Sequence, residues 1–202
     1  LFQKEDGPKF PERGVGLTAD ISAKFADAAT SFIRRKTGKP FFLQVNFTAP
    51  HDPLLMPPGY ENKYDPTKIP LPKNFLPRHP FEHGNFDGRD EKMLPWPRNP
   101  EMVRKNLAVY YAVISHMDEQ IGRILDVLDQ TKQTKDTLVI FTSDHGLAVG
   151  SHGLMGKQNM YDHTIRVPLV LAGPGVPKGK RNEALCYLRD LFPTACDLVD
   201  LP

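Results

Sequence analysis

The sequence lacks the features that mark several large classes of protein. Only two of its 202 residues are cysteines, Cys186 and Cys196, so neither a disulfide framework nor a cysteine-based zinc site can define the fold. The two could form one disulfide, but we expect ordinary buried thiols. No uninterrupted apolar stretch reaches the roughly 20 residues of a membrane-spanning helix, which predicts a chain that does not insert into membranes.

An excess of charge of one sign is also missing. The chain has 26 basic and 24 acidic residues and a formal net charge of +2, without a long run of either sign. Such a balance gives no electrostatic basis for binding nucleic acid or an anionic membrane surface. We therefore expect no nucleic-acid partner, and the oligomeric state is left open.

Several common catalytic motifs do not occur. Ser143 and Ser151 lack the Gly-x-Ser-x-Gly context of a nucleophile elbow. The sequence contains no Walker-type phosphate loop and no dinucleotide fingerprint. Any active site must therefore be built from residues that lie in other patterns.

What is present predicts an α/β domain. Hydrophobic residues make up 40% and charged residues 25% of the chain, as in ordinary globular proteins. The order strand, helix, strand predicts a right-handed parallel crossover and a mostly parallel central sheet flanked by helices. The predicted elements are helices over 18–38, 99–131 and 188–199 and strands over 41–48, 138–141 and 167–172.

The first two helices carry clear apolar stripes. Thr18 is the expected N-cap of the first helix, and Asn99 that of the second, with Pro100 in its first turn. The expected core-facing residues are Ile21, Phe25, Ala28 and Phe32 in the first helix and Val103, Leu107, Tyr110, Ile114, Met117, Ile121, Ile124 and Leu128 in the second.

Residues 50–100 interrupt the regular pattern. This stretch holds 12 of the chain's 20 prolines, which exclude a long helix or a central strand. Its aromatic residues supply apolar surface with which it can pack down. We expect an ordered excursion near the mouth of the site, since long loops in compact domains are commonly functional.

The chemical centre is expected in residues 137–161. Asp144 and His145 directly follow the apolar strand 138–141, where open α/β sheets gather ligands. A carboxylate and an imidazole can bind one divalent cation, although the dipeptide alone is equally well explained as a turn.

Three further side chains are candidates for anion chemistry. Lys157 lies in a glycine-punctuated loop and suits a tetrahedral oxyanion, although a lone lysine is more often solvated surface. His152 could contact substrate or have no role. His51 follows the strand 41–48 and could protonate a leaving group, or merely order its proline-rich turn. Together they predict a metal-plus-cation site for a sulfuryl or phosphoryl ester.

Several motifs together resemble the sulfatase family of the alkaline-phosphatase-like superfamily, nearly end to end. They are Lys39-Pro-Phe-Phe-Leu with Ala49-Pro-His-Asp-Pro, Tyr110-Tyr-Ala with Met117-Asp-Glu-Gln-Ile-Gly-Arg, Phe141-Thr-Ser-Asp-His-Gly, Gly153-Leu-Met-Gly-Lys, and Arg166-Val-Pro-Leu with Gly173-Pro-Gly. The resemblance implies a three-layer sandwich and hydrolysis of a sulfate ester of a sugar or small molecule.

The resemblance also assigns roles to matching positions. Asp144 and His145 fall on two ligands of the family's divalent cation, Ca²⁺ foremost, with Mg²⁺ or Mn²⁺ as alternatives. Many relatives have asparagine at the second of these positions, which leaves the metal open. Lys157 falls on the lysine that contacts the sulfate, and His51 on the histidine near the sulfate and the leaving-group oxygen.

The sequence departs from the family pattern in its nucleophile. The family uses a formylglycine made from a Cys/Ser-x-Pro/Ala-x-Arg motif, and neither Cys186 nor Cys196 begins one. The upstream aspartate pair and the Gly-Lys-x-His segment are missing too. We therefore expect residues 1–202 to be a single partial sulfatase catalytic domain, inactive alone.

Two alternatives to a sulfatase remain at this stage. They are a phosphonate or phosphate ester hydrolase of the same superfamily and a degenerate module that binds sulfated glycans without turnover. The family resemblance implies a periplasmic or extracellular location, with the cytoplasm as the alternative.

Overall fold

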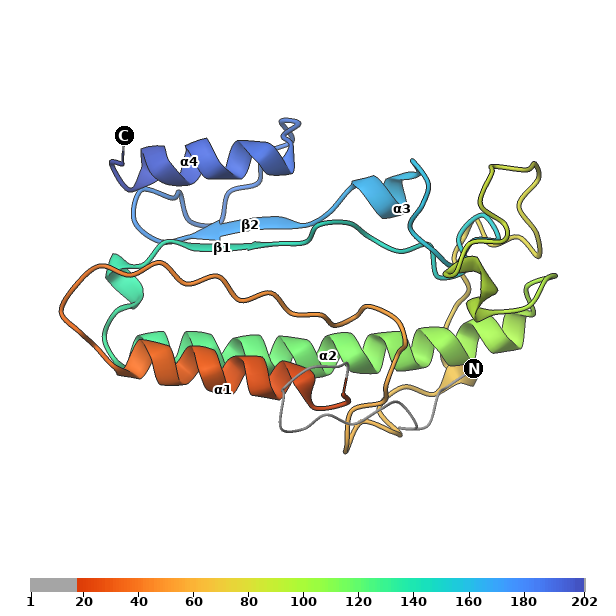
Figure 1. The fold of residues 1–202 in the computed structure, drawn as a ribbon, viewed down its shortest axis with the longest axis horizontal. Helices are drawn as coiled ribbons and strands as arrows, with labels where there is room; N and C mark the ends of the chain where they lie inside the picture. Colours follow the sequence, from red (N-terminus) through yellow and green to blue (C-terminus); the bar gives the residue numbers. More distant parts are fainter. Residues whose placement is uncertain (1–17, 202) are drawn as a thin grey trace.

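The computed structural model describes residues 18–201, which form an α/β arrangement (Figure 1). Two helices, α1 (Ile21–Arg34) and α2 (Pro100–Gln130), pack side by side. In this view the strands β1 (Val139–Thr142) and β2 (Leu169–Ala172) lie between that pair and the helix α4 (Leu191–Leu198). The short elements are α3 (Asp162–Ile165) and 3₁₀ turns at Pro66–Lys68, Glu91–Met93, Thr134–Asp136 and Leu188–Asp190.

Helix α2 connects two hydrophobic cores. Its start is as predicted, since the Asn99 side chain accepts hydrogen bonds from the backbone N–H groups of Glu101 and Met102 at 2.8 and 3.1 Å. The core at its N-terminal half consists of Val103, Leu107 and Ala108 with Ile69, Leu94, Val149 and Met155. The core at its C-terminal half consists of Val127 and Leu128 with Ile33. The first core holds the loop that follows β1 against the helix.

Helix α1 differs from its prediction in two details. Asp20, not Thr18, is the N-cap residue, and the Thr18 hydroxyl donates to the Asp20 carboxylate at 2.5 Å. The buried face is offset by one residue from the predicted stripe and consists of Ser22, Ala26, Ala29 and Ile33. The reason is that α1 has two neighbours: this face packs toward α2, while its phenylalanines face residues 41–48.

Residues 41–48 do not form the predicted strand. Phe41 and Phe47 pack on α1, edge-on to Phe32 and Phe25 at centroid distances of 5.7 and 6.1 Å. Leu43 packs against the core that contains Ile33. Phe42 on the other face is 86% exposed. The alternation is therefore real, but residues 41–47 form no backbone hydrogen bond with another backbone group in the described chain. Without a ladder partner, the predicted parallel crossover does not form within residues 18–201.

The described sheet has two strands, and they run antiparallel. Val139 pairs with Ala172 and Thr142 with Leu169. The predicted parallel crossover concerned residues 41–48 and β1, so this antiparallel pair leaves the prediction of a mostly parallel sheet untested. The strands are less buried than predicted, since Phe141 is 38% and Val170 56% exposed.

The proline-rich excursion, residues 50–100, is irregular as predicted, with two 3₁₀ turns and no longer helix. Its residues Ile69 and Leu94 enter the core beside α2. Cys186 is exposed and unpaired, so the expectation of a buried thiol is wrong there, while Cys196 is partly buried and also free. Within residues 18–201, no helix combines the length and apolarity needed to cross a membrane.

Candidate functional site

A tight crossing of the chain holds Asp144 and His145 at the end of β1. The backbone N–H of Gly146 donates to the carbonyl of Thr164 at 2.8 Å. A Cβ atom at residue 146 would lie 1.9 Å from the carbonyl oxygen of His163, so only glycine fits this approach. The Asp-His-Gly sequence is thus a packed junction and more than a surface turn.

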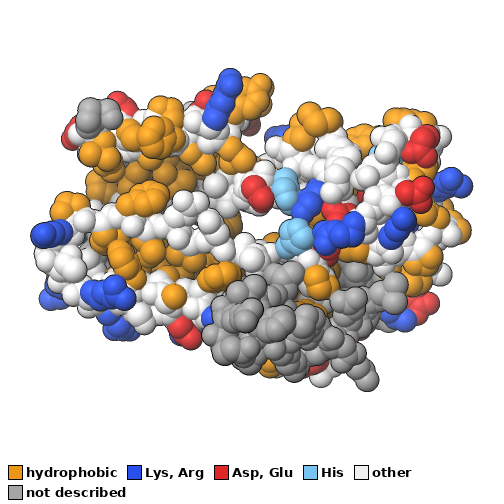
Figure 2. All heavy atoms as spheres, viewed as in Figure 1, with side chains coloured by type: hydrophobic (Ala, Val, Ile, Leu, Met, Phe, Trp, Pro, Cys, Tyr) orange, Lys and Arg blue, Asp and Glu red, His pale blue; other side chains and the backbone are white. Residues whose placement is uncertain are grey.

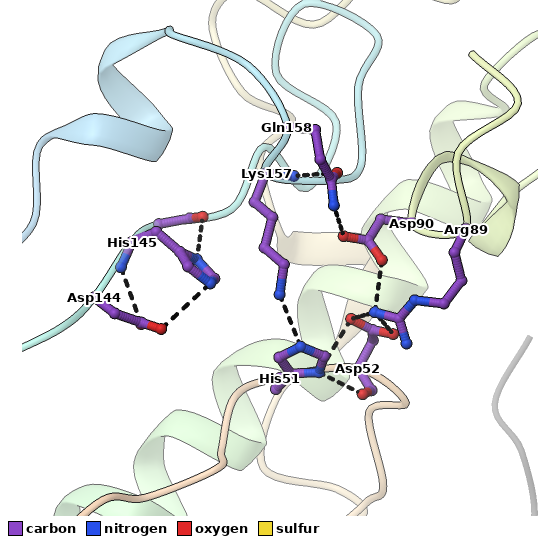
Figure 3. A network of polar contacts seen from close by, with 9 residues as sticks. His51, Asp52, Arg89, Asp90, Asp144, His145, Lys157 and Gln158 are labelled. Atoms are coloured by element: carbon purple, nitrogen blue, oxygen red, sulfur yellow. Dashed lines mark hydrogen bonds and ion pairs between the residues drawn. The ribbon is translucent and has the colours of Figure 1, made fainter. Parts of the chain in front are cut away.

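The loop then folds back and returns Lys157 toward its starting point. Ala148 and Gly150 donate backbone hydrogen bonds to the carbonyls of Gly156 and Leu154 at 3.0 and 2.7 Å. The returning segment brings Lys157 between the Asp144–His145 pair and the excursion (Figure 3).

Lys157 meets His51, which comes from a distant part of the sequence. The distance between Lys157 Nζ and His51 Nε2 is 2.7 Å. His51 Nδ1 lies 2.7 Å from the backbone carbonyl of Asp52, an acceptor only, so Nδ1 carries the proton in this contact. Nε2 is then free to accept a hydrogen bond from the lysine ammonium. The structure therefore brings together two candidates that are 106 positions apart.

Carboxylates and an arginine surround this pair on one side (Figure 3). One guanidinium nitrogen of Arg89 lies 2.9 Å from the Asp52 carboxylate and 2.6 Å from the Asp90 carboxylate. Gln158, next to Lys157, donates to Asp90 at 3.0 Å. The network joins the excursion, to which His51 belongs, to the loop that carries Lys157.

Asp90 is the most deeply buried carboxylate of this network, with a side chain only 1% exposed. Burial acts to raise the pKa of Asp90, but the hydrogen bond from Gln158 and the hydrogen bond and charge of Arg89 outweigh it, so the pKa of Asp90 is lowered. A charged Asp90 can therefore hold Arg89 and Gln158 in place near neutral pH.

Asp144 and His145 lie across the Lys157 side chain from this network in Figure 3. The Asp144 side chain is 83% exposed, and its carboxylate accepts a hydrogen bond from the His145 backbone N–H at 3.0 Å. Imidazole Nε2 lies 3.5 Å from the same carboxylate. An accessible oxygen and nitrogen side by side fit two positions around a divalent cation. Residues 18–201 contain no cluster of three or more His, Cys, Asp or Glu side chains suited to a metal.

One face of the described residues has an opening. Figure 2 shows an opening in the middle of this face, bordered by histidine, acidic and basic side chains, with hydrophobic side chains gathered to one side. Polar side chains around an opening can orient a small ligand.

His152, the remaining candidate, is held elsewhere. Its ring stacks on Tyr161 with centroids 4.0 Å apart and planes 13° apart. Its Nε2 lies 2.9 Å from the Asn74 side-chain nitrogen. Within residues 18–201 it shares no hydrogen bond with Lys157 or His51, and a role in substrate binding stays a prediction.

Comparison with known proteins decides the family. The family model described as Sulfatase matches residues 3–201. The chain belongs to the sulfatase family. A choline-sulfatase of Rhizobium meliloti is 33% identical, over 81% of this chain and 32% of the relative. An arylsulfatase of Clostridium perfringens is 33% identical, over 83% of this chain and 36% of the relative. The chain thus spans about a third of the length of these curated relatives.

The fold also matches solved structures of this superfamily. A phosphonate monoester hydrolase from Silicibacter pomeroyi is 30% identical, with a TM-score of 0.78 over 92% of this chain and 39% of that chain. The match confirms an α/β fold shared with sulfatases and related hydrolases.

Sequence reasoning missed the network around the predicted site of this member of the sulfatase family. Asp52 and Gln158 could have been noticed because each adjoins a candidate residue, His51 or Lys157. Arg89 and Asp90 carried no such signal. The excursion has neither a hydrophobic periodicity nor a motif from which the positions of its charged side chains could be predicted.

His163 predicts an acid-sensitive fold. Burial lowers the pKa of His163 from 6.5 to about 4, and the neighbouring His152 adds to the effect. The unfolded chain therefore binds a proton that the folded chain excludes, and stability should fall as the pH drops from 6.5 toward 4.

The measurement is urea unfolding of the protein across that pH range, with His163→Asn beside the wild type. The variant should lose less stability on acidification. An identical pH slope for both proteins would show that His163 does not cause the acid sensitivity.

Proposed function

We propose that the protein carrying this chain hydrolyses a sulfate ester of a sugar or another small molecule. The observation that supports this most directly is the 2.7 Å contact between Lys157 and His51, beside Asp144 and His145, in a member of the sulfatase family. The Lys157 ammonium and the His51 imidazole, once Nε2 is protonated, can each donate to one oxygen of a tetrahedral anion.

Lys157 and His51 would act on different oxygens of the substrate. The Lys157 ammonium attracts a sulfuryl oxygen and stabilises the charge that grows on it during sulfur–oxygen cleavage. To assist the leaving oxygen, His51 would carry a second proton on Nε2. That proton would replace the hydrogen bond that Nε2 accepts from Lys157 in this structure. The Asp52 carbonyl keeps the other ring nitrogen protonated and fixes the orientation of the ring.

The divalent cation and the nucleophile would complete the site. Asp144 and His145 would hold a divalent cation, Ca²⁺ by family resemblance with Mg²⁺ or Mn²⁺ as alternatives, which supplies positive charge to the sulfuryl oxygens when bound. The attacking oxygen would belong to a formylglycine in a part of the protein outside this chain, as the family resemblance implies. His152 is proposed as an additional substrate contact.

A phosphonate or phosphate ester hydrolase is the second candidate. The structural match to a phosphonate monoester hydrolase supports it, but the family model and the named sulfatases favour sulfate. A degenerate module that binds sulfated glycans without turnover is the third candidate.

Residues 1–202 are proposed to be part of one catalytic domain, a three-layer sandwich whose mostly parallel sheet continues beyond this chain. The unpaired extended segment 41–48 supports this proposal, since it has the side-chain alternation of a strand. For the location, we propose the periplasm or the outside of the cell, on family resemblance alone.

The test compares this chain alone with the longer protein that carries it. Each is assayed with aryl sulfate and aryl phosphonate esters, with and without a chelator. We expect sulfate hydrolysis by the longer protein, its loss with the chelator, and no turnover by residues 1–202. Turnover by this chain alone would contradict the assignment of the nucleophile, and a preference for phosphonate would favour the second candidate.

A further inference from the structure

We propose that Glu91 and Arg98, whose side chains are both buried, are positioning residues that set the place of Lys157. The proposal rests on the proposed function, because it deepens the account of the same site. Its basis is a buried ion pair that forms hydrogen bonds with the backbone of the loop carrying the lysine.

Glu91 binds the backbone directly in front of Lys157. Its carboxylate accepts hydrogen bonds from the backbone N–H groups of Met155 at 3.0 Å and Gly156 at 2.8 Å. The Glu91 side chain is 2% exposed, so these bonds are shielded from water. A carboxylate that holds two successive N–H groups fixes the direction in which the chain enters residue 157.

Arg98 binds both Glu91 and the beginning of the same turn. It forms an ion pair with the Glu91 carboxylate, and its side chain is fully buried. Its Nε donates to the carbonyl of Gly153 at 2.9 Å, at the far end of the same short turn. Its Nη1 donates to the Glu91 carbonyl at 2.8 Å and to the Leu94 carbonyl. The pair therefore spans the turn 153–156.

The turn packs closely against the excursion at its two glycines. A Cβ atom at residue 156 would lie 2.8 Å from Asp90 Cβ and 3.0 Å from the Glu91 carboxylate. A Cβ atom at residue 153 would lie 2.8 Å from the His79 backbone nitrogen. The glycines allow the excursion to approach closely, and the ion pair then sets the register between turn and excursion.

A buried ion pair is weak support for stability as such, since its members give up solvation. Here the pair binds the backbone of the turn that precedes Lys157, at Gly153, Met155 and Gly156. Arg98 also binds the backbone carbonyls of Glu91 and Leu94. A specific geometry at the lysine is a function that apolar residues of similar volume could not provide, because they cannot bind the N–H and carbonyl groups of the turn.

The experiment uses the longer protein and the variants Glu91→Gln and Val127→Ala. Val127 is buried in the separate core at the other end of α2, so its truncation lowers stability without touching the turn. We expect Glu91→Gln to lower kcat/KM by about 10- to 100-fold, the scale of a small misplacement of a catalytic group. Val127→Ala should leave kcat/KM unchanged at a temperature where both are folded.

A double-mutant cycle with Lys157→Ala then isolates the mechanism. If Glu91 acts through Lys157, its substitution should cost little more activity once the lysine is gone. The proposal would be overturned if the activity losses of Glu91→Gln and Lys157→Ala multiply in the double variant. It would also be overturned if Val127→Ala lowers kcat/KM as much as Glu91→Gln does. If Glu91→Gln does not fold, Arg98→Lys carries the same comparison, since lysine cannot reach both Glu91 and Gly153 in the same way.

Amide hydrogen exchange keeps this proposal separate from the proposed function. In Glu91→Gln, the amides of Met155 and Gly156 should exchange faster than in the wild type and in Val127→Ala. If the longer protein hydrolyses no ester, the proposed function fails. Amide exchange then still tests whether Glu91 holds the backbone of Met155 and Gly156. Unchanged exchange at both amides would remove Glu91 as a positioning residue.

Discussion

Replacing Lys157 by alanine in the longer protein is expected to lower kcat/KM for a sulfate ester by about 10²- to 10³-fold, the range seen when one charge-stabilising donor is removed. The physical reason is that Lys157 is the cation in direct contact with His51, at 2.7 Å. Without it, charge that develops on the sulfuryl oxygens loses a donor, and His51 Nε2 loses its hydrogen-bond partner.

The measurement combines turnover with binding of inorganic sulfate as a competitive inhibitor. Both should weaken in Lys157→Ala. Lys178→Ala serves as the matched control, since Lys178 is an exposed lysine in a surface turn and should affect neither quantity. If turnover and sulfate binding both survive the loss of Lys157, the lysine is only a surface residue.

Replacing Asp144 by alanine should abolish metal-dependent hydrolysis, with a loss of at least about 100-fold. Asp144 presents an 83% exposed carboxylate beside the His145 ring, and no lysine or arginine in residues 18–201 forms an ion pair with it. Its removal would leave His145 as the single protein ligand from this part of the chain.

Metal content measured on the purified proteins is the readout that accompanies activity. Asp144→Ala should retain less metal than the wild type, whereas Asp126→Ala, an exposed aspartate on α2, should retain all of it. A fully metal-loaded Asp144→Ala protein with an unchanged rate would show that Asp144 is not a ligand.

The sequence predicted those elements that depend on residues close together in the chain. The cap at Asn99, the long helix behind it and the short strand before Asp144 follow from side-chain chemistry and periodicity within a few residues. The alternation in residues 41–48 is equally real, but a strand also needs a partner at hydrogen-bonding distance. The periodicity of one segment contains no information about that partner.

The candidate site shows the same division. His51, Lys157, Asp144 and His145 could be selected from their residue types and their places after predicted strands, and the sulfatase resemblance assigned their roles. The contact of His51 with Lys157 could not be predicted from spacing, because it depends on how the loop after β1 folds back on the excursion. Arg89 and Asp90 could not be selected at all.

The sequence by itself determined the α/β class, the family and the four residues whose chemistry suits a sulfuryl ester. Only the tertiary structure decided that Glu91 and Arg98 grip the turn before Lys157 and that β1 and β2 run antiparallel. The physical reason is that residue type and periodicity act over a few positions along the chain. An ion pair buried against the backbone of a distant loop exists only once two segments about 65 residues apart have packed together.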